Sequence, residues 1–247
     1  MSNPRHEPTV RGYAVTHPAG SATLPLEPGW HQFVYAAAGT MTVSTARGAW
    51  TLPPHRGLWI GEHEPVTVTN PASVAMRVLY LDAALRALDG AARAVNVPRF
   101  ARELVLHAVR VAPLRTSDPV QSALVTLLVD QLAALQAAPL WLPLPTDPRA
   151  RDLADAVRAR PDADLDALAR RVSTGRRTLE RLFPAETGLT LGAWRRRARI
   201  LRSVELLGAG APVTRAAVEV GYTTPSAFVV AFRAELGETP GRYLGGV

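Results

Sequence analysis

The stretch GYTTPSAFVVAFRAELGETPGRY, Gly221 to Tyr243, decides the fold of the C-terminal half of this chain. Within it, FRAELGET at Phe232 to Thr239 resembles an earlier segment, FPAETGLT at Phe183 to Thr190. Alanine, glutamate, glycine and threonine recur in the two segments at an offset of 49 residues. We infer that one supersecondary unit is present twice.

Each copy of the unit is predicted to be two short helices joined by a tight turn. Apolar residues recur with helical spacing in the first helix of each copy: Leu165, Leu168, Ala169 and Val172, then Val213, Ala216, Ala217 and Val220. The turn falls near residues 173–175 in the first copy and 221–223 in the second. Thr224 followed by Pro225 is typical of a helix start. Gly188 and Gly237 stand where a helix should end.

Two such units favour a pair of helix-turn-helix motifs over a plain helical bundle. Charge points the same way. The chain has a formal net charge of +7, and its basic residues are all arginine. Ten of them lie between Arg170 and Arg202 against two acids, a local net charge of +8. A focused positive stretch attracts polyanions, although a solvated basic helix face has the same composition.

A single helix is expected to join the two copies, from Thr190 to Leu207. It would be about 27 Å long at 1.5 Å per residue. Its buried stripe is expected to hold Trp194, Ala198, Leu201 and Val204, and its arginines are expected to face elsewhere. A rod of that length can hold two reading helices about one DNA turn, near 34 Å, apart.

The N-terminal half reads differently. Short apolar runs separated by glycine or proline fill residues 11–81 and predict six or seven strands of a sandwich or jelly-roll barrel. Helical patterns begin near Asp82, with helices expected at 98–111 and 119–137. The proline-rich segment 141–148 is expected to be a linker. The fold class is therefore α+β: a barrel at 1–81, a helical dimerisation and linker region at 82–140, and an all-α DNA-binding domain at 147–247.

From Leu165 to Tyr243 the chain resembles the AraC/XylS family of bacterial transcription regulators. The resemblance rests on LARRVSTGRRTLERLFPAETG, WRRRARIL and VGYTTPSAFVVAFRAELGETPGRY. The N-terminal half, at WHQFVYAAAGTMTV and LPPHRGLWI, is similar more loosely to the cupin-like barrels of many members. The resemblance implies double-stranded operator DNA as partner, a small-molecule effector in the barrel, a homodimer and contact with RNA polymerase.

The resemblance also assigns DNA-binding residues in the first recognition helix. Arg177, Glu180 and Arg181 would face bases, and Arg176 would lie near the backbone. Adding the repeat offset of 49 gives Ser226, Val229 and Val230 in the second recognition helix. Valine can contact a thymine methyl but cannot form the paired hydrogen bonds that read a base, so the two valines depart from the family pattern. The remaining DNA-binding candidates are expected to contact phosphates: Arg195, Arg196, Arg199 and Thr224.

Effector contacts in the barrel are expected from Trp30, His31, Tyr35, Trp50, Arg56 and Trp59, although each aromatic ring could equally be a core residue. Only one histidine stands where metal-binding cupins carry a His-x-His pair, and His55 and His63 are scattered. We therefore expect no metal and no cofactor.

The residue composition argues against two other function classes. The chain has no cysteine, which excludes an alkyl-acceptor thiolate. A cupin enzyme would need the missing metal ligands, so no enzyme activity is expected. No secretory signal or apolar span is evident, and a cytoplasmic protein is expected. The alternative to an effector sensor is a barrel that only dimerises or binds a protein partner. The apolar stripe from Val120 to Leu135 is either a dimer seam or a face packed on the barrel.

Overall fold

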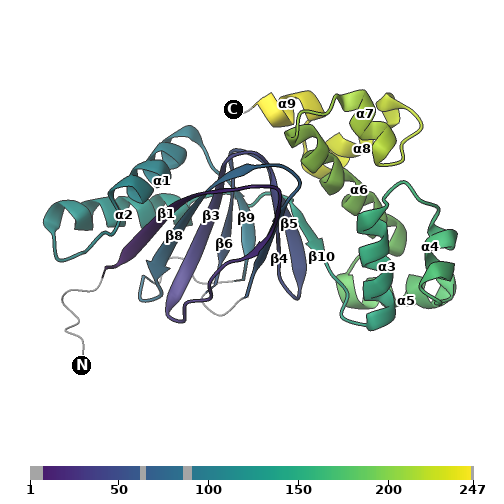
Figure 1. Ribbon diagram of the computed structural model, residues 1–247, viewed down its shortest axis with the longest axis horizontal. Helices are drawn as coiled ribbons and strands as arrows, with labels where there is room; N and C mark the ends of the chain where they lie inside the picture. Colours follow the sequence, from purple (N-terminus) through teal and green to yellow (C-terminus); the bar gives the residue numbers. More distant parts are fainter. Residues whose placement is uncertain (1–7, 62–64, 86–90, 246–247) are drawn as a thin grey trace. The chain divides into compact units, whose positions relative to one another are not determined.

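The computed structural model of the 247-residue chain describes residues 8–61, 65–85 and 91–245 (Figure 1). The fold is α+β, with antiparallel sheets in the N-terminal half and helices in the C-terminal half. The described residues divide into two compact units. One comprises the residues up to Met41 together with Leu52–Ala138, and the other comprises Thr42–Thr51 and the residues from Pro139 onward.

The first sheet has the strand order β1-β8-β3-β6-β9 and is antiparallel throughout. Its strands are β1 (Val10–His17), β8 (Val74–Asp82), β3 (Trp30–Ala38), β6 (Arg56–Ile60) and β9 (Arg93–Asn96). Strand β3 is central, since Gln32 pairs with Tyr80 on one side and with Ile60 on the other. Strand β9 lies in the region that was expected to be helical, so the sheet continues past residue 81.

The second sheet has the order β10-β5-β4-β7-β2. Its strands are β10 (Trp141–Pro143), β5 (Gly48–Leu52), β4 (Met41–Ser44), β7 (Thr67–Asn70) and β2 (Gly20–Thr23). Strand β10 occupies the start of the segment expected to be a linker. It pairs with β5 through Trp141 and Trp50. The linker expectation was wrong for these three residues, because pairing with a neighbouring strand outweighs the extended, unpaired preference of a proline-rich segment.

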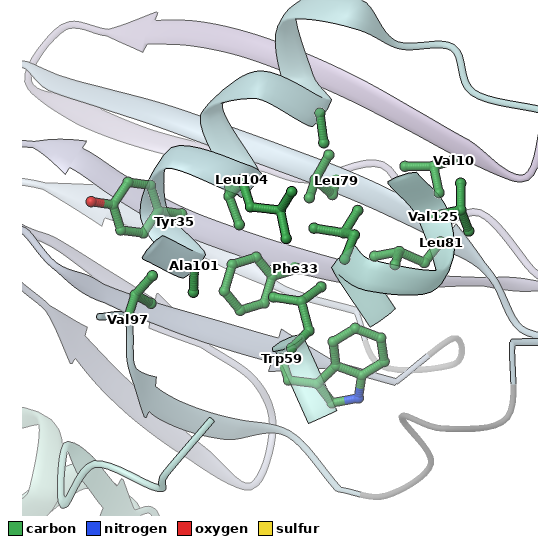
Figure 2. Packing of buried hydrophobic residues seen from close by; sticks show 14 of the residues in the cluster. Val10, Phe33, Tyr35, Trp59, Leu79, Leu81, Val97, Ala101, Leu104 and Val125 are labelled. Atoms are coloured by element: carbon green, nitrogen blue, oxygen red, sulfur yellow. The ribbon is translucent and has the colours of Figure 1, made fainter. Parts of the chain in front are cut away.

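Helices α1 (Arg99–Val111) and α2 (Pro119–Ala133) pack on one face of the first sheet. Alternation along β3 places Phe33 and Tyr35 on that face, where they are 1% and 0% exposed. Figure 2 shows the shared core, with side chains of the strands and of both helices pointing toward one another. Helix α2 ends four residues before the expected boundary at 137, and its buried residues are Val125, Leu128 and Leu132.

The C-terminal unit contains seven helices among its described residues. They are α3 (Pro148–Ala159), α4 (Leu165–Arg171), α5 (Arg176–Thr187), α6 (Leu191–Gly208), α7 (Val213–Glu219), α8 (Pro225–Leu236) and α9 (Pro240–Gly245). Helix α6 contacts α3 and α5 of the first half and α7, α8 and α9 of the second half. All four residues of its expected stripe are buried, from Trp194 to Val204. The single connecting helix is thus confirmed.

Local capping chemistry sets the ends of the repeated helices. The Thr224 side chain accepts a hydrogen bond from the Ala227 amide at the start of α8. Gly188 and Gly237 end α5 and α8 in the left-handed conformation, with φ of 71° and 83°. Gly221 adopts φ of 80° in the turn between α7 and α8. Since L side chains disfavour this conformation, glycine suits the three positions.

Among the helices in the described ranges, none combines the length and the apolar character needed to cross a bilayer.

Candidate nucleic-acid interface

Helix α5 presents an exposed basic face. Arg177 and Arg181 are separated by four residues, so they lie one above the other on the helix surface, and both are exposed. In the part of the chain that the structure describes, neither guanidinium has an ion-pair partner. Leu179 and Phe183, on the opposite face, are 0% exposed. The helix is therefore held by its apolar face and leaves two arginines available to a polyanion.

Arg176 and Glu180 lie on the same helix but bind each other. The Arg176 Nε atom is 2.9 Å from Glu180 Oε1, and its Nη1 atom is 2.8 Å from Asp166 Oδ1 of α4. The hydrogen bond to Glu180, followed by the one to Asp166, raises the pKa of Arg176. All three side chains are about half exposed. Arg176 thus connects the two helices of the first unit, and Glu180 would have to leave this ion pair to accept from cytosine.

Helix α8 presents a less polar face. Ser226 is exposed, Val230 is 71% exposed and Val229 is half-buried. Thr224 lies at the helix start, where its hydroxyl oxygen already caps the Ala227 amide at 3.3 Å. An exposed valine on a helix that buries Phe228 and Phe232 is available for apolar contact but cannot donate or accept hydrogen bonds.

One exposed arginine of α8 escaped sequence analysis. Arg233 lies in the last turn, three residues after Val230 and seven after Ser226. Residues at this spacing share one helix face, and the spacing was the signal that could have found it. The repeat concealed it, because the corresponding position of α5 is Pro184.

The arginines of α6 divide into two groups. Arg196 has a side chain that is 56% exposed, and its Nε atom lies 3.4 Å from Glu235 Oε1. Arg195 instead donates to the backbone carbonyls of Pro161 and Ala163. Arg199 donates to the Val220 carbonyl and lies over the Tyr222 ring, 4.6 Å from its centroid. The outward placement expected for Arg195 and Arg199 therefore differs from the structure, which gives both of them internal partners.

Comparison with known proteins agrees with this geometry. Residues 168–245 match a helix-turn-helix domain family. The HTH-type transcriptional regulator NimR of Escherichia coli (strain K12) is 26% identical over 218 residues, which cover 86% of this chain and 79% of NimR. Residues 168–245 of this chain therefore form a helix-turn-helix domain of the AraC type.

Solved structures are also similar to this chain. ToxT from Vibrio cholerae is 11% identical with a TM-score of 0.41, over 96% of this chain and 98% of ToxT. The DNA-binding domain of AdpA, solved in complex with a target DNA, is 31% identical with a TM-score of 0.36, over 40% of this chain and 92% of that domain.

The N-terminal candidates for effector binding do not form one cluster. Trp30 and His31 are successive residues of β3, so they point to opposite faces of the sheet. The His31 ring lies 5.0 Å from the ring of Trp59, and Trp59 belongs to the core beneath α1 and α2, together with Tyr35. Trp30 instead carries the Arg11 guanidinium over its ring at 4.1 Å. Tyr35 and Trp59 are thus core aromatics, as the alternative interpretation held.

The remaining N-terminal candidates, Trp50 and Arg56, are not members of this core cluster. Trp50 belongs to β5 of the second sheet and is 4% exposed. Arg56 begins β6, next to His55, and burial, followed by the charge of Arg102, lowers the pKa of His55. In residues 8–61, 65–85 and 91–245, no group of three histidine, cysteine or acidic side chains could hold a metal ion. His63 lies outside the described residues.

Proposed function

We propose that this chain binds operator DNA sequence-specifically, with α5 and α8 in two successive major grooves. The observation that carries the proposal is the pair of helix-turn-helix units on one helix, α6, each with an exposed face on its second helix. A reading helix in the major groove contacts base edges, whereas phosphate contacts set register and affinity.

The DNA contacts proposed for α5 follow from which of its side chains are exposed and which guanidinium groups have no ion-pair partner among the described residues. Arg177 and Arg181 can each donate two parallel hydrogen bonds to guanine O6 and N7. Glu180 can accept from cytosine N4 once its bond with Arg176 is exchanged, and Arg176 would then be near the backbone. The separation of α5 into two free arginines and one ion-paired arginine supports this assignment.

In α8 the proposed contacts are weaker. Val230 and Val229 would meet thymine methyls, and Thr224 and Ser226 would hold a phosphate at the helix N-terminus. Arg233 joins this surface as a further phosphate or base contact, because it shares the exposed face of Val230. We assign the phosphate contact of α6 to Arg196, whose side chain is the most exposed of the three arginines that form ion pairs on this helix in the described structure.

We further propose that a small molecule bound by the N-terminal unit controls DNA binding, and that the protein acts in the cytoplasm as a homodimer that contacts RNA polymerase. Trp59 Nε1, buried in this unit, has no hydrogen-bond partner among the described residues. Such a donor is costly unless something accepts from it. A thermal-shift screen of metabolites against the full chain tests the effector, since a ligand of the folded state raises the melting temperature.

The proposed dimer surface lies on α2. Leu128 and Leu132 of the expected stripe are 0% and 3% exposed and pack on the sheet, so they are not available to a second chain. Val120 and Leu127 remain, at 80% and 41% exposed. An exposed apolar pair on a helix otherwise buried on one side supports self-association there. If no metabolite raises the melting temperature, a barrel that only dimerises or binds a protein partner is favoured.

Selection of bound sequences from random double-stranded DNA tests the central proposal. We expect an enriched site with two conserved parts about one helical turn apart. The part read by α5 should contain guanines and should be the sharper of the two. Recovery of unenriched DNA would contradict sequence-specific binding.

A further inference from the structure

Two arginines of α6 are directed inward, one at the segment that precedes α4 and one at the turn between α7 and α8. Arg195 Nη2 donates to the carbonyls of Pro161, at 3.4 Å, and Ala163, which lie just before α4 of the first unit. Arg199, one helical turn later, donates from Nε to the carbonyl of Val220, which lies in the turn between α7 and α8 of the second unit. Side chains of α6 therefore donate hydrogen bonds to backbone carbonyls on both sides of this helix in the sequence.

These two segments approach each other closely. A Cβ atom placed on Gly221 would lie 2.9 Å from the Asp162 Cα atom and would collide with the Arg199 guanidinium. Only glycine leaves room for this approach, and its φ of 80° also suits glycine. The turn of the second unit is thus packed directly against the segment that precedes α4 of the first.

Arg199 fills the junction between them. Its guanidinium lies 4.6 Å above the centre of the Tyr222 ring, the residue that follows Gly221. Burial lowers the pKa of Arg199, and burial raises the pKa of Tyr222. The guanidinium of an arginine keeps its charge in folded proteins. A half-buried charge is costly without partners, and here a carbonyl and an aromatic face provide them.

We propose that Arg199 is a positioning residue that fixes the distance and angle between α5 and α8, and so determines which spacing of half-sites the protein accepts. The inference rests on the proposed function, since it assumes that α5 and α8 read DNA. The planar guanidinium is essential to the role, because the Val220 carbonyl and the Tyr222 ring are engaged by its edge and its face respectively.

A phosphate-contacting arginine would behave differently. Removing a phosphate contact lowers affinity for every sequence and reduces the slope of log affinity against log salt by about 0.9. Lysine would replace it in part, since a phosphate also accepts a point charge. Removing a positioning arginine should leave the salt slope unchanged and should relax the preference for one half-site spacing.

The test measures binding of the full chain to a selected operator and to versions with one base pair added or removed between the two half-sites. Each base pair rotates one half-site relative to the other by about 36°, since a turn holds 10–10.5 base pairs. The variants are Arg199→Met, Arg199→Lys and Tyr222→Leu. Arg196→Ala, on the exposed side of the same helix, is the matched control.

For the wild type we expect an altered spacing to weaken binding roughly 5- to 150-fold, the range of losing one base contact. Arg199→Met, Arg199→Lys and Tyr222→Leu should reduce this penalty to less than about threefold, with an unchanged salt slope and unchanged preferences within each half-site. Arg196→Ala should instead keep the spacing penalty and reduce the slope of log affinity against log salt.

A reduced salt slope for Arg199→Met, with the spacing penalty intact, would overturn the inference while leaving the proposed function standing. An Arg199→Lys variant that keeps the wild-type spacing penalty would overturn the inference as well. Wild-type protein that binds no DNA would instead refute the proposed function. If circular dichroism shows that Arg199→Met is unfolded, Tyr222→Leu decides, because it removes the stacking partner without changing any charge of α6.

Discussion

Replacing Trp194 with phenylalanine should destabilise the C-terminal unit measurably. Trp194 of α6 is 0% exposed, and its Nε1 atom donates to the Pro143 carbonyl at 2.6 Å. Its ring meets the Phe183 ring of α5 edge to face, with centroids 5.1 Å apart. The residue therefore connects α6, α5 and the strand that precedes the helical unit.

The expected cost follows from these contacts. Phenylalanine cannot donate, so the buried Pro143 carbonyl loses its partner, which costs about 1–3 kcal/mol. The smaller ring leaves a cavity that adds about 1 kcal/mol. Together the change should lower the free energy of unfolding by about 2–4 kcal/mol. For a unit of about 100 residues, this corresponds to a melting temperature lower by roughly 10 °C or more.

Differential scanning calorimetry of the full chain measures the shift in the C-terminal transition. Trp141→Phe is the matched control, because Trp141 is 44% exposed, and it should cost about 0.5 kcal/mol or less. A Trp194→Phe variant as stable as the control would refute the reasoning, because the hydrogen bond and the ring contact would then contribute nothing.

Three further predictions concern DNA reading, the entry to α3 and self-association. Arg181→Ala should weaken the free energy of DNA binding by about 1–3 kcal/mol and erase the preference at one base pair, whereas Val230→Ala should weaken it by less than about 1 kcal/mol. Titration of both variants against single-base operator variants at fixed salt checks this. A larger specificity change for the valine variant would mean that the DNA-facing sides of the helices are wrongly assigned. Glu186→Ala removes the carboxylate that accepts from the Thr146 amide at 2.6 Å, and should speed amide exchange at the start of α3; unchanged exchange would argue against a role for this contact. Val120→Asp should convert a dimer into a monomer without lowering the melting temperature, as measured by light scattering; an unchanged dimer would exclude the α2 surface.

The sequence predicted those parts of the fold that depend on local chemistry. The repeat located both helix-turn-helix units, and the threonine cap before Pro225 and the glycine at 237 marked the limits of α8 within a residue. Strands β9 and β10 escaped prediction. They are four and three residues long, and their existence depends on pairing with partners distant in sequence rather than on their own propensity.

The residues of the candidate site also divide into those that local periodicity predicts and those that depend on tertiary contacts. Exposure of Arg177 and Arg181 followed from helical periodicity, because the buried positions of α5 fix the opposite face. The internal contacts of Arg195 and Arg199 could not be predicted from helical periodicity. A long arginine side chain can extend along the surface to partners that the helical position alone does not specify. The core placement of Tyr35 and Trp59 depended on which sheet face α1 and α2 cover, and this was not evident from strand alternation alone.

The most direct test of the central claim is hydroxyl-radical footprinting of the full chain on a selected operator. The account predicts two protected backbone patches on one face of the duplex, about one helical turn apart, one for α5 and one for α8. A single patch, or uniform protection without discrete patches, would contradict two-groove reading.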